Sequence, residues 1–180
     1  TNTDTLTVTV DVTPPTGSSV TCTFPYDTDG SYNVTGTAGS DAGATVDTTA
    51  SYFQRRTGTL SGNTCAGWLS YSNQGAANAV NLGETSLATG CYEYQYYTVD
   101  MVGNSTTSGE TCVIKVDTTL PSISVSGITE SSNYIYYNSG TLYYTNAPAT
   151  PGSFTVDVTS ADADTLVTGV AGSTEFGDTP

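Results

Sequence analysis

Apolar and polar residues alternate strictly along residues 5–12, so one face of an extended segment is apolar and the other is polar. This period-two alternation predicts a half-buried β-strand. The same alternation returns at residues 111–117. The inward positions are Leu6, Val8, Val10 and Val12 in the first segment and Cys112, Ile114 and Val116 in the second. Each segment runs into a proline-marked junction, which is typical of the last strand of a domain.

The two segments belong to an internal repeat. Val10-Asp11-Val12-Thr13-Pro14-Pro15 returns as Val116-Asp117-Thr118-Thr119-Leu120-Pro121, at a constant offset (117 − 11 = 106). A period near a hundred residues indicates small domains in series rather than one large globule. We therefore expect residues 1–11 to be the terminal strand of a preceding repeat or a donated strand, residues 12–117 a complete β-sandwich, and residues 118–180 the first part of a second.

Short β-rich runs separated by turn signals, with no helical period longer than a turn, predict antiparallel β-sandwiches. In the second copy, residues 152–156 match residues 30–34 at an offset of 122 (152 − 30 = 122), so about sixteen residues are inserted near 133–148. We expect this last module to be incomplete within the 180 residues. An open half-sandwich is unfavourable in water, so either the polypeptide continues or another molecule supplies the missing strands.

The segment 91–100 is the strongest single strand signal. Tyr92, Tyr94, Tyr96 and Thr98 share one face, and such an aromatic ladder is predicted to lie in the sandwich core, with hydroxyls that need partners. One of these tyrosines is a candidate for the tyrosine corner of an immunoglobulin-like fold.

The four cysteines allow three pairings. Cys112 falls on Leu6 and Cys22 falls on Ile128 at the repeat offset (112 − 6 = 106; 128 − 22 = 106), so both occupy positions where the sister repeat has a core hydrophobe. This favours a Cys22–Cys112 bridge and leaves Cys65 with Cys91. The alternative is four buried free thiols in a reducing compartment.

The amino-acid composition disfavours several classes of function. The net charge of −14 disfavours contact with nucleic acid or anionic membranes, and a surface rich in hydroxyls and amides suits an extracellular or cell-surface protein. The chain contains no histidine, so a hydroxyl nucleophile lacks its usual base and a Cys–His pair cannot form. We expect no enzymatic activity and no cofactor other than, at most, calcium.

Calcium prefers oxygen ligands, which aspartates in turns and junctions supply. The candidate ligands are Asp27, Asp29, Asp11 and Asp117. No complete calcium-loop spacing is present, and aspartates in tight turns also serve by hydrogen-bonding their own backbone. Asn33 and Asn104 begin glycosylation sequons.

The inserted segment predicts a hairpin over residues 133–144, with Asn-Ser-Gly at its turn and tyrosines on both arms. Exposed tyrosines suit lateral protein contacts or stacking on sugar rings, whereas buried ones would only pack their own module. The candidate interaction residues are Tyr134, Tyr136, Tyr137, Tyr143 and Tyr144.

Four motifs together resemble the bacterial immunoglobulin-like repeats of very large cell-surface and adhesin-like proteins, which are similar to fibronectin type III modules. The motifs are residues 54–65, Gly90-Cys91-Tyr92-Glu93-Tyr94-Gln95-Tyr96, Asp100-Met101-Val102-Gly103-Asn104 and Val116-Asp117-Thr118-Thr119-Leu120-Pro121. The resemblance implies tandem immunoglobulin-like sandwiches outside a prokaryotic cell, and it implies no chemistry.

The sequence thus predicts a non-catalytic structural or adhesive segment of an extracellular filament or giant surface protein. Its expected partners are neighbouring copies of itself or adjacent repeats. One alternative is a module that binds carbohydrate or another ligand, such as surface glycans, with the tyrosine hairpin as its platform. The other is a self-polymerising fibre subunit that donates its Thr5–Val12 strand to the next copy.

Overall fold

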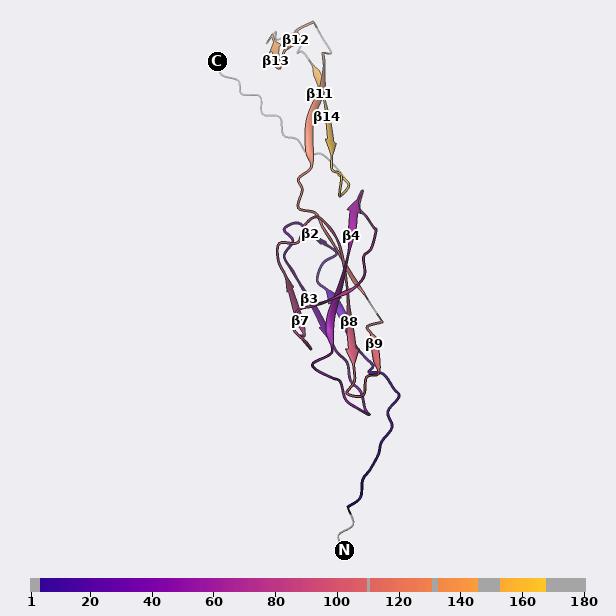
Figure 1. Cartoon of the computed structure of the whole chain (residues 1–180). Helices are drawn as coiled ribbons and strands as arrows, with labels where there is room; N and C mark the ends of the chain where they lie inside the picture. The colour runs from indigo at the N-terminus through magenta and orange to yellow at the C-terminus, as the bar shows by residue number, and fades with distance from the viewer. Residues whose placement is uncertain (1–3, 110, 131–132, 146–152, 168–180) are drawn as a thin grey trace. The chain divides into compact units, whose positions relative to one another are not determined.

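Fourteen β-strands and no helix make up the described part of this computed structural model, which covers residues 4–109, 111–130, 133–145 and 153–167. The chain divides into two units, Thr1–Thr119 and Leu120–Pro180, which are described separately below (Figure 1). The division falls two residues beyond the expected 117/118 boundary (119 − 117 = 2). Nowhere in those ranges is a helix long and apolar enough to cross a membrane.

Unit 1 contains two β-sheets (Figure 1). The smaller has the order β1-β3-β7, with β1 at Ser19–Cys22, β3 at Tyr32–Thr37 and β7 at Asn81–Glu84. The larger has the order β2-β10-β8-β4-β5, with β2 at Tyr26–Asp27, β10 at Cys112–Val116, β8 at Gly90–Val99, β4 at Tyr52–Ser61 and β5 at Thr64–Ala66. β6 (Ser72–Gln74) pairs with β4, and β9 (Ser105–Thr107) pairs with β8. Pairing is antiparallel except between β10 and β2.

The inner faces of the two sheets form one core. Val20, Val34 and Leu82 of the smaller sheet cluster with Phe53, Tyr92, Tyr94, Tyr96, Cys112, Ile114 and Val116 of the larger. The predicted tyrosine ladder is therefore buried, because alternation along β8 directs every second side chain between the sheets. Its hydroxyls have partners: Tyr92 donates to the carbonyl of Ala88 at 2.8 Å, and Tyr96 donates to the carbonyl of Ala79 at 3.1 Å.

Two disulfides join the strands of unit 1. Cys22 of β1 is bonded to Cys112 of β10, and Cys65 of β5 is bonded to Cys91 of β8, with Cα–Cα separations of 5.6 and 5.8 Å. These are the two pairs favoured by the repeat offset. The first links the two sheets across the core, and the second ties β5 into the larger sheet.

Unit 2 contains two antiparallel strand pairs in its described residues. β11 (Ser122–Glu130) pairs with β14 (Phe154–Ala161), and β12 (Ile135–Asn138) pairs with β13 (Thr141–Tyr144). Ile128 lies opposite Val156, as Cys22 lies opposite Val34 in unit 1. The two offsets read from the sequence relate these pairs (128 − 22 = 106; 156 − 34 = 122), so β11 and β14 correspond in register to β1 and β3 at this end of the strands. Between Val125 and Gly127 the register of β11 shifts.

Residues 4–15 form no strand with any described part of the chain, so the alternation at residues 5–12 produces no strand among the described residues. Its four apolar side chains, Leu6, Val8, Val10 and Val12, are 76 to 87% exposed. The physical reason is that a β-strand needs a neighbour to satisfy its backbone hydrogen bonds. The first paired residue is Thr16, whose N–H donates to the Ser40 carbonyl at 2.9 Å.

Candidate functional site

Among the described residues of unit 2, the hairpin of β12 and β13 carries the most exposed aromatic surface. Its two-residue loop, Ser139 and Gly140, has φ values of 48° and 86°, the left-handed pair that suits the twist of a tight hairpin. Tyr136 and Tyr143 lie directly opposite each other, with ring centroids 6.1 Å apart and planes inclined by 28°. Their side chains are 59% and 56% exposed. The hairpin therefore presents two nearly parallel rings to solvent.

The opposite face of this hairpin is anchored. Ile135 is buried, Leu142 is half-buried, and the backbone N–H of Tyr137 donates to a carboxylate oxygen of Glu130 at 2.6 Å. The five tyrosines singled out from the sequence are all exposed by more than a third: Tyr134, Tyr136, Tyr137, Tyr143 and Tyr144. Tyr137 and Tyr144 share the face of Ile135 and Leu142, whereas the nearly parallel Tyr136 and Tyr143 lie on the opposite face.

A cluster of three carboxylates lies in unit 1. Oxygens of Asp11, Asp41 and Asp100 approach within 4.8 Å of one another. Each carboxylate also accepts hydrogen bonds in its own turn: Asp41 accepts from Gly43 and Ala44, and Asp11 accepts from Thr13. Asp11 accepts in addition from the N–H of Ala44, in the turn of Asp41, at 2.6 Å. These hydrogen bonds lower the repulsion among the three charges, so turn chemistry accounts for the cluster.

Asp100 explains the Asp-x-x-Gly-Asn motif of residues 100–104. One carboxylate oxygen accepts from the backbone of Val102 at 2.9 Å and of Asn104 at 2.8 Å, and the other accepts from the Asn104 amide at 2.7 Å. Gly103 has a φ of 96°, which the turn requires. Burial raises the pKa of Asp100, but the hydrogen bonds from Asn104 and Val102 outweigh it and hold that pKa below the ordinary value.

The other calcium candidates serve local turns. Asp27 accepts from the backbone of Asp29, Gly30 and Ser31 at 2.6 to 3.3 Å. Asp117 accepts from the N–H and hydroxyl of Thr119 at 3.0 and 2.6 Å. The structure groups Asp11 with Asp41 and Asp100 rather than with Asp27 and Asp29. Sequence reasoning missed Asp41 as a neighbour of Asp11 because the two are thirty residues apart (41 − 11 = 30).

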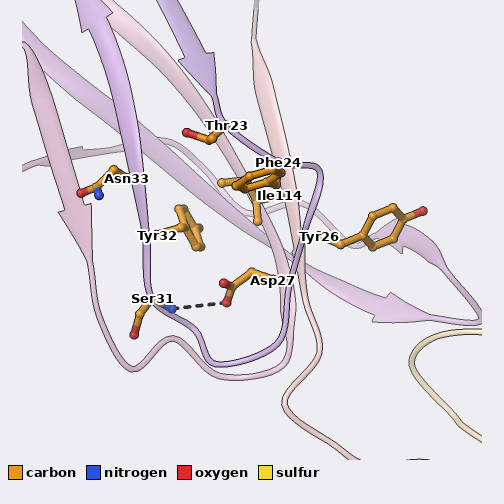
Figure 2. A pocket seen from close by; sticks show the side chains of 8 residues that line it. All are labelled: Thr23, Phe24, Tyr26, Asp27, Ser31, Tyr32, Asn33 and Ile114. Carbon is orange, nitrogen blue, oxygen red and sulfur yellow. Dashed lines mark hydrogen bonds between the residues drawn. The ribbon is translucent and has the colours of Figure 1, made fainter.

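A pocket of about 340 Å³ opens beside β2 and β3 (Figure 2). Phe24, Tyr32 and Ile114 supply apolar and aromatic walls, and Asp27 is its carboxylate. That carboxylate is already held by the backbone of its own turn, including Ser31 at 3.3 Å. The pocket offers an apolar recess and no second carboxylate in its lining.

Unit 1 also contains an ion pair that was not anticipated. Arg55 shares the inner face of β4 with Phe53, and its guanidinium donates to Glu84 of β7 at 2.8 Å. The Tyr94 hydroxyl donates to the same carboxylate oxygen at 2.9 Å, and the Tyr32 hydroxyl lies 2.6 Å from that of Tyr94. Burial raises the pKa of both tyrosines well above the ordinary value, so both stay protonated. The network ties the two sheets together.

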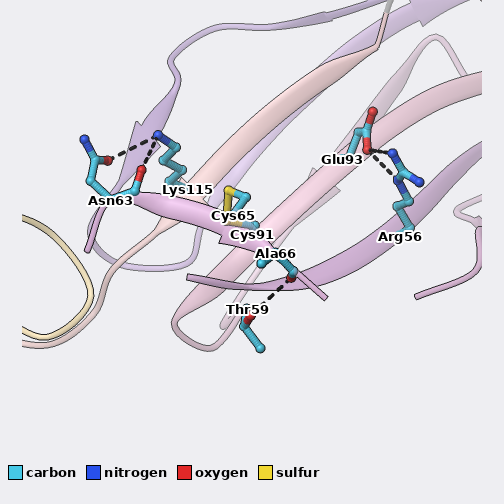
Figure 3. Close-up of a disulfide and its surroundings, with 8 residues drawn as sticks. All are labelled: Arg56, Thr59, Asn63, Cys65, Ala66, Cys91, Glu93 and Lys115. Atoms are coloured by element: carbon cyan, nitrogen blue, oxygen red, sulfur yellow. Dashed lines mark hydrogen bonds and ion pairs between the residues drawn. A yellow bond between two sulfur atoms is a disulfide. The ribbon is translucent and has the colours of Figure 1, made fainter. Parts of the chain in front are cut away.

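The outer face of the larger sheet is also braced near the Cys65–Cys91 disulfide (Figure 3). Arg56 pairs with Glu93, and its guanidinium lies 5.0 and 4.9 Å from the ring centres of Trp68 and Tyr71. On β10, Lys115 points outward and donates to the backbone and side-chain oxygens of Asn63 at 2.8 and 3.2 Å. All three basic side chains of the protein therefore hold local contacts.

The two sequons differ in their surroundings. The Asn104 side-chain nitrogen, to which a glycan would attach, donates to Asp100 and, at 3.3 Å, to the carbonyl of Asp11. Asn33 lies on β3 and is exposed. The geometry favours Asn33 as the accessible sequon.

The chain is an all-β protein whose first unit is held by two disulfides, a feature typical of proteins outside the reducing cytoplasm. Searches of protein-family models, curated proteins and solved structures return no match to it.

Proposed function

We propose that this chain is a non-catalytic structural segment of an extracellular filament or giant surface protein, built from immunoglobulin-like β-sandwiches in series. The observation that carries the proposal is the pairing register that β1–β3 and β11–β14 share up to the bulge between Val125 and Gly127, in which Cys22 opposite Val34 corresponds to Ile128 opposite Val156. Because a register is fixed by which side chains face the core, unrelated strand pairs have no reason to share it.

The two proline-marked junctions, at Asp11 and Asp117, also support modules in series. Asp11 accepts from the N–H and hydroxyl of Thr13 at 3.0 and 2.7 Å, and Asp117 accepts from Thr119 in the same way. Each junction therefore has the same hydrogen-bonded Asp-x-Thr turn ahead of a proline. Such turns, together with the restricted φ of proline, limit bending between consecutive modules.

The immunoglobulin-like assignment is supported by two features of unit 1. The sheets have the orders β1-β3-β7 and β2-β10-β8-β4-β5, and the last strand pairs in parallel with the short β2. Tyr92, near the start of β8, donates its hydroxyl to the carbonyl four residues upstream, which is the contact of a tyrosine corner. Both features belong to sandwiches used widely as extracellular spacers.

Immunogold labelling tests the location and role. Antibodies raised against folded unit 1 are applied to intact producing cells and to permeabilised ones. Label along filaments or on the outer envelope of intact cells is expected. Label that reaches the protein only after permeabilisation would refute an extracellular scaffold.

Carbohydrate binding is a second candidate function, favoured by the exposed, nearly parallel rings of Tyr136 and Tyr143. Aromatic faces stack on sugar rings, and the hydroxyls offer hydrogen bonds at the edge. Binding of glycans to the protein is measured on an array and by calorimetry. Loss of binding in Tyr136→Ala, with retention in the control Tyr144→Ala on the other face of the hairpin, is expected; equal behaviour of the two variants would count against this platform.

A further inference from the structure

The segment Thr5–Val12 has an alternating strand sequence but pairs with no strand in the described part of the chain. Its apolar side chains, Leu6, Val8, Val10 and Val12, are 76 to 87% exposed. A segment with strict alternation has one apolar face, which leaves water only when it packs against another apolar surface.

Unit 2 has an apolar face that the described residues leave largely exposed. Val125 lies opposite Val158, and Ile128 lies opposite Val156, so these four side chains share one face of the β11–β14 pair. Val125, Val156 and Val158 are 62%, 36% and 42% exposed. In unit 1 the corresponding face lies in the core, where Val34 is fully buried.

The repeat identifies what covers that face in unit 1. β10 covers it together with β8 and β4; the inward residues of β10, Cys112, Ile114 and Val116, are 7%, 1% and 0% exposed, and Cys112 is bonded to Cys22 of β1. At the offset of 106, Leu6 corresponds to Cys112 and Ile128 corresponds to Cys22 (112 − 6 = 106; 128 − 22 = 106). Thr5–Val12 is therefore the β10 sequence of another module.

We propose that residues 5–12 of one copy dock on the apolar face of β11 and β14 of a second copy, with Leu6 against Ile128. This inference rests on the serial modules proposed above, and it adds the contact that joins separate copies. Because the donor segment and the acceptor face are different surfaces of the same chain, the contact is heterologous and repeats from copy to copy.

The two docking copies are both negatively charged. No Lys or Arg lies between residues 120 and 180, and each copy carries a net charge of −14. Docking is therefore driven by apolar burial against like-charge repulsion. Raising the ionic strength screens that repulsion and strengthens the association, whereas contacts between opposite charges would weaken.

Disulfide trapping between two chains tests the register. Leu6→Cys and Ile128→Cys are placed on separate chains, mixed under oxidising conditions and resolved on non-reducing gels. Because Cys22 and Cys112 form this bridge in unit 1, a covalent dimer linking positions 6 and 128 is expected by mass spectrometry. Thr7→Cys, which points to the opposite face of the segment, is the matched control and should give little or no dimer with Ile128→Cys.

A second measurement uses no added cysteine. Sedimentation of the native chain should show assembly that increases with protein concentration and with salt, and Leu6→Ser with Val8→Ser should abolish it. Failure of the trap, or equal trapping at positions 6 and 7, overturns the docking, as does a native chain that stays monomeric. Peptide mapping that still finds Cys22–Cys112 and Cys65–Cys91 intact would leave the proposal of serial modules standing. Failure of the docking can therefore be distinguished from failure of that proposed function.

Discussion

The Cys22–Cys112 disulfide is expected to make unit 1 almost inextensible when it is pulled through its junctions. Tension enters near Asp11 and leaves near Asp117, and the disulfide connects the chain between these points with a sequence separation of 90. The residues inside that loop carry no load while the bond is intact. The Cys65–Cys91 bond, with a separation of 26, lies within the loop and is shielded from tension.

The lengths follow from the sequence separations. With the clamp intact, only 16 residues between Asp11 and Asp117 can be stretched (106 − 90 = 16), or ~6 nm at ~3.6 Å per residue. The variant Cys22→Ser with Cys112→Ser releases 64 further residues (90 − 26 = 64), or ~23 nm, because the inner bond still shortens the loop. By loop-closure entropy, the two bonds differ by only about 1 kcal/mol in stability. Their mechanical effects should differ far more.

Single-molecule force spectroscopy with handles on the two ends of the chain measures these lengths. Unit 2 contributes equally to every variant, so differences between variants report on unit 1. The matched control, Cys65→Ser with Cys91→Ser, should extend no further than the native protein. A clamp-free variant that gains no length, or a control that gains as much, would show that tension does not follow this path.

Three other predictions concern stability, each measured by urea unfolding. Removing one partner of the Arg55–Glu84 pair, as in Glu84→Gln or Arg55→Met, should cost about 3 kcal/mol of unfolding free energy, whereas Arg55→Met with Glu84→Leu should recover most of that loss. A double variant whose loss equals the sum of the two single losses would mean that the charges are not coupled. Thr98→Val should stabilise unit 1 by about 1 kcal/mol, because the buried Thr98 hydroxyl has no partner in the described part of the chain; destabilisation would reveal one. Hydrogen bonds lower the pKa of three aspartates below the ordinary value of 3.8 in the folded protein. The stabilisation from these carboxylates is therefore complete above pH ~4 and is lost as the pH falls further, so the urea concentration at the unfolding midpoint should decline in that range. A urea midpoint independent of pH would contradict the assignment. The three aspartates are Asp11, Asp47 and Asp100.

Several elements were predictable from local sequence patterns because the interactions that form them also involve residues close together in the sequence. The ladder of Tyr92, Tyr94 and Tyr96 is buried because alternation alone decides which face of β8 a side chain occupies. The hairpin turn at Ser139 and Gly140 forms where short-range turn chemistry places it. The disulfide pairing needed the repeat offset as well, since spacing along one copy leaves three connectivities open.

The Arg55–Glu84 pair shows where sequence reasoning stops. Arg55 lies two residues after the buried Phe53, and Glu84 lies two residues after the buried Leu82. Alternation along each strand therefore places each of these charged side chains on the inward face. Neither strand says that the two charges face each other, because that depends on how β4 and β7 stack across the core. The cluster of Asp11 and Asp100 was missed for the same reason, since separate loops bring the two carboxylates together.

The segment Thr5–Val12 departs from its pattern for a different reason. Alternation specifies which face of a strand is apolar, but a strand exists only when a neighbour accepts and donates its backbone hydrogen bonds. Within unit 1 the equivalent contact is closed covalently by Cys22 and Cys112. At the proposed contact between copies, Leu6 and Ile128 replace those cysteines, so that contact is held by apolar burial alone. A string built in this way would part between copies before a clamped module could lengthen, which leaves each module folded and able to dock again.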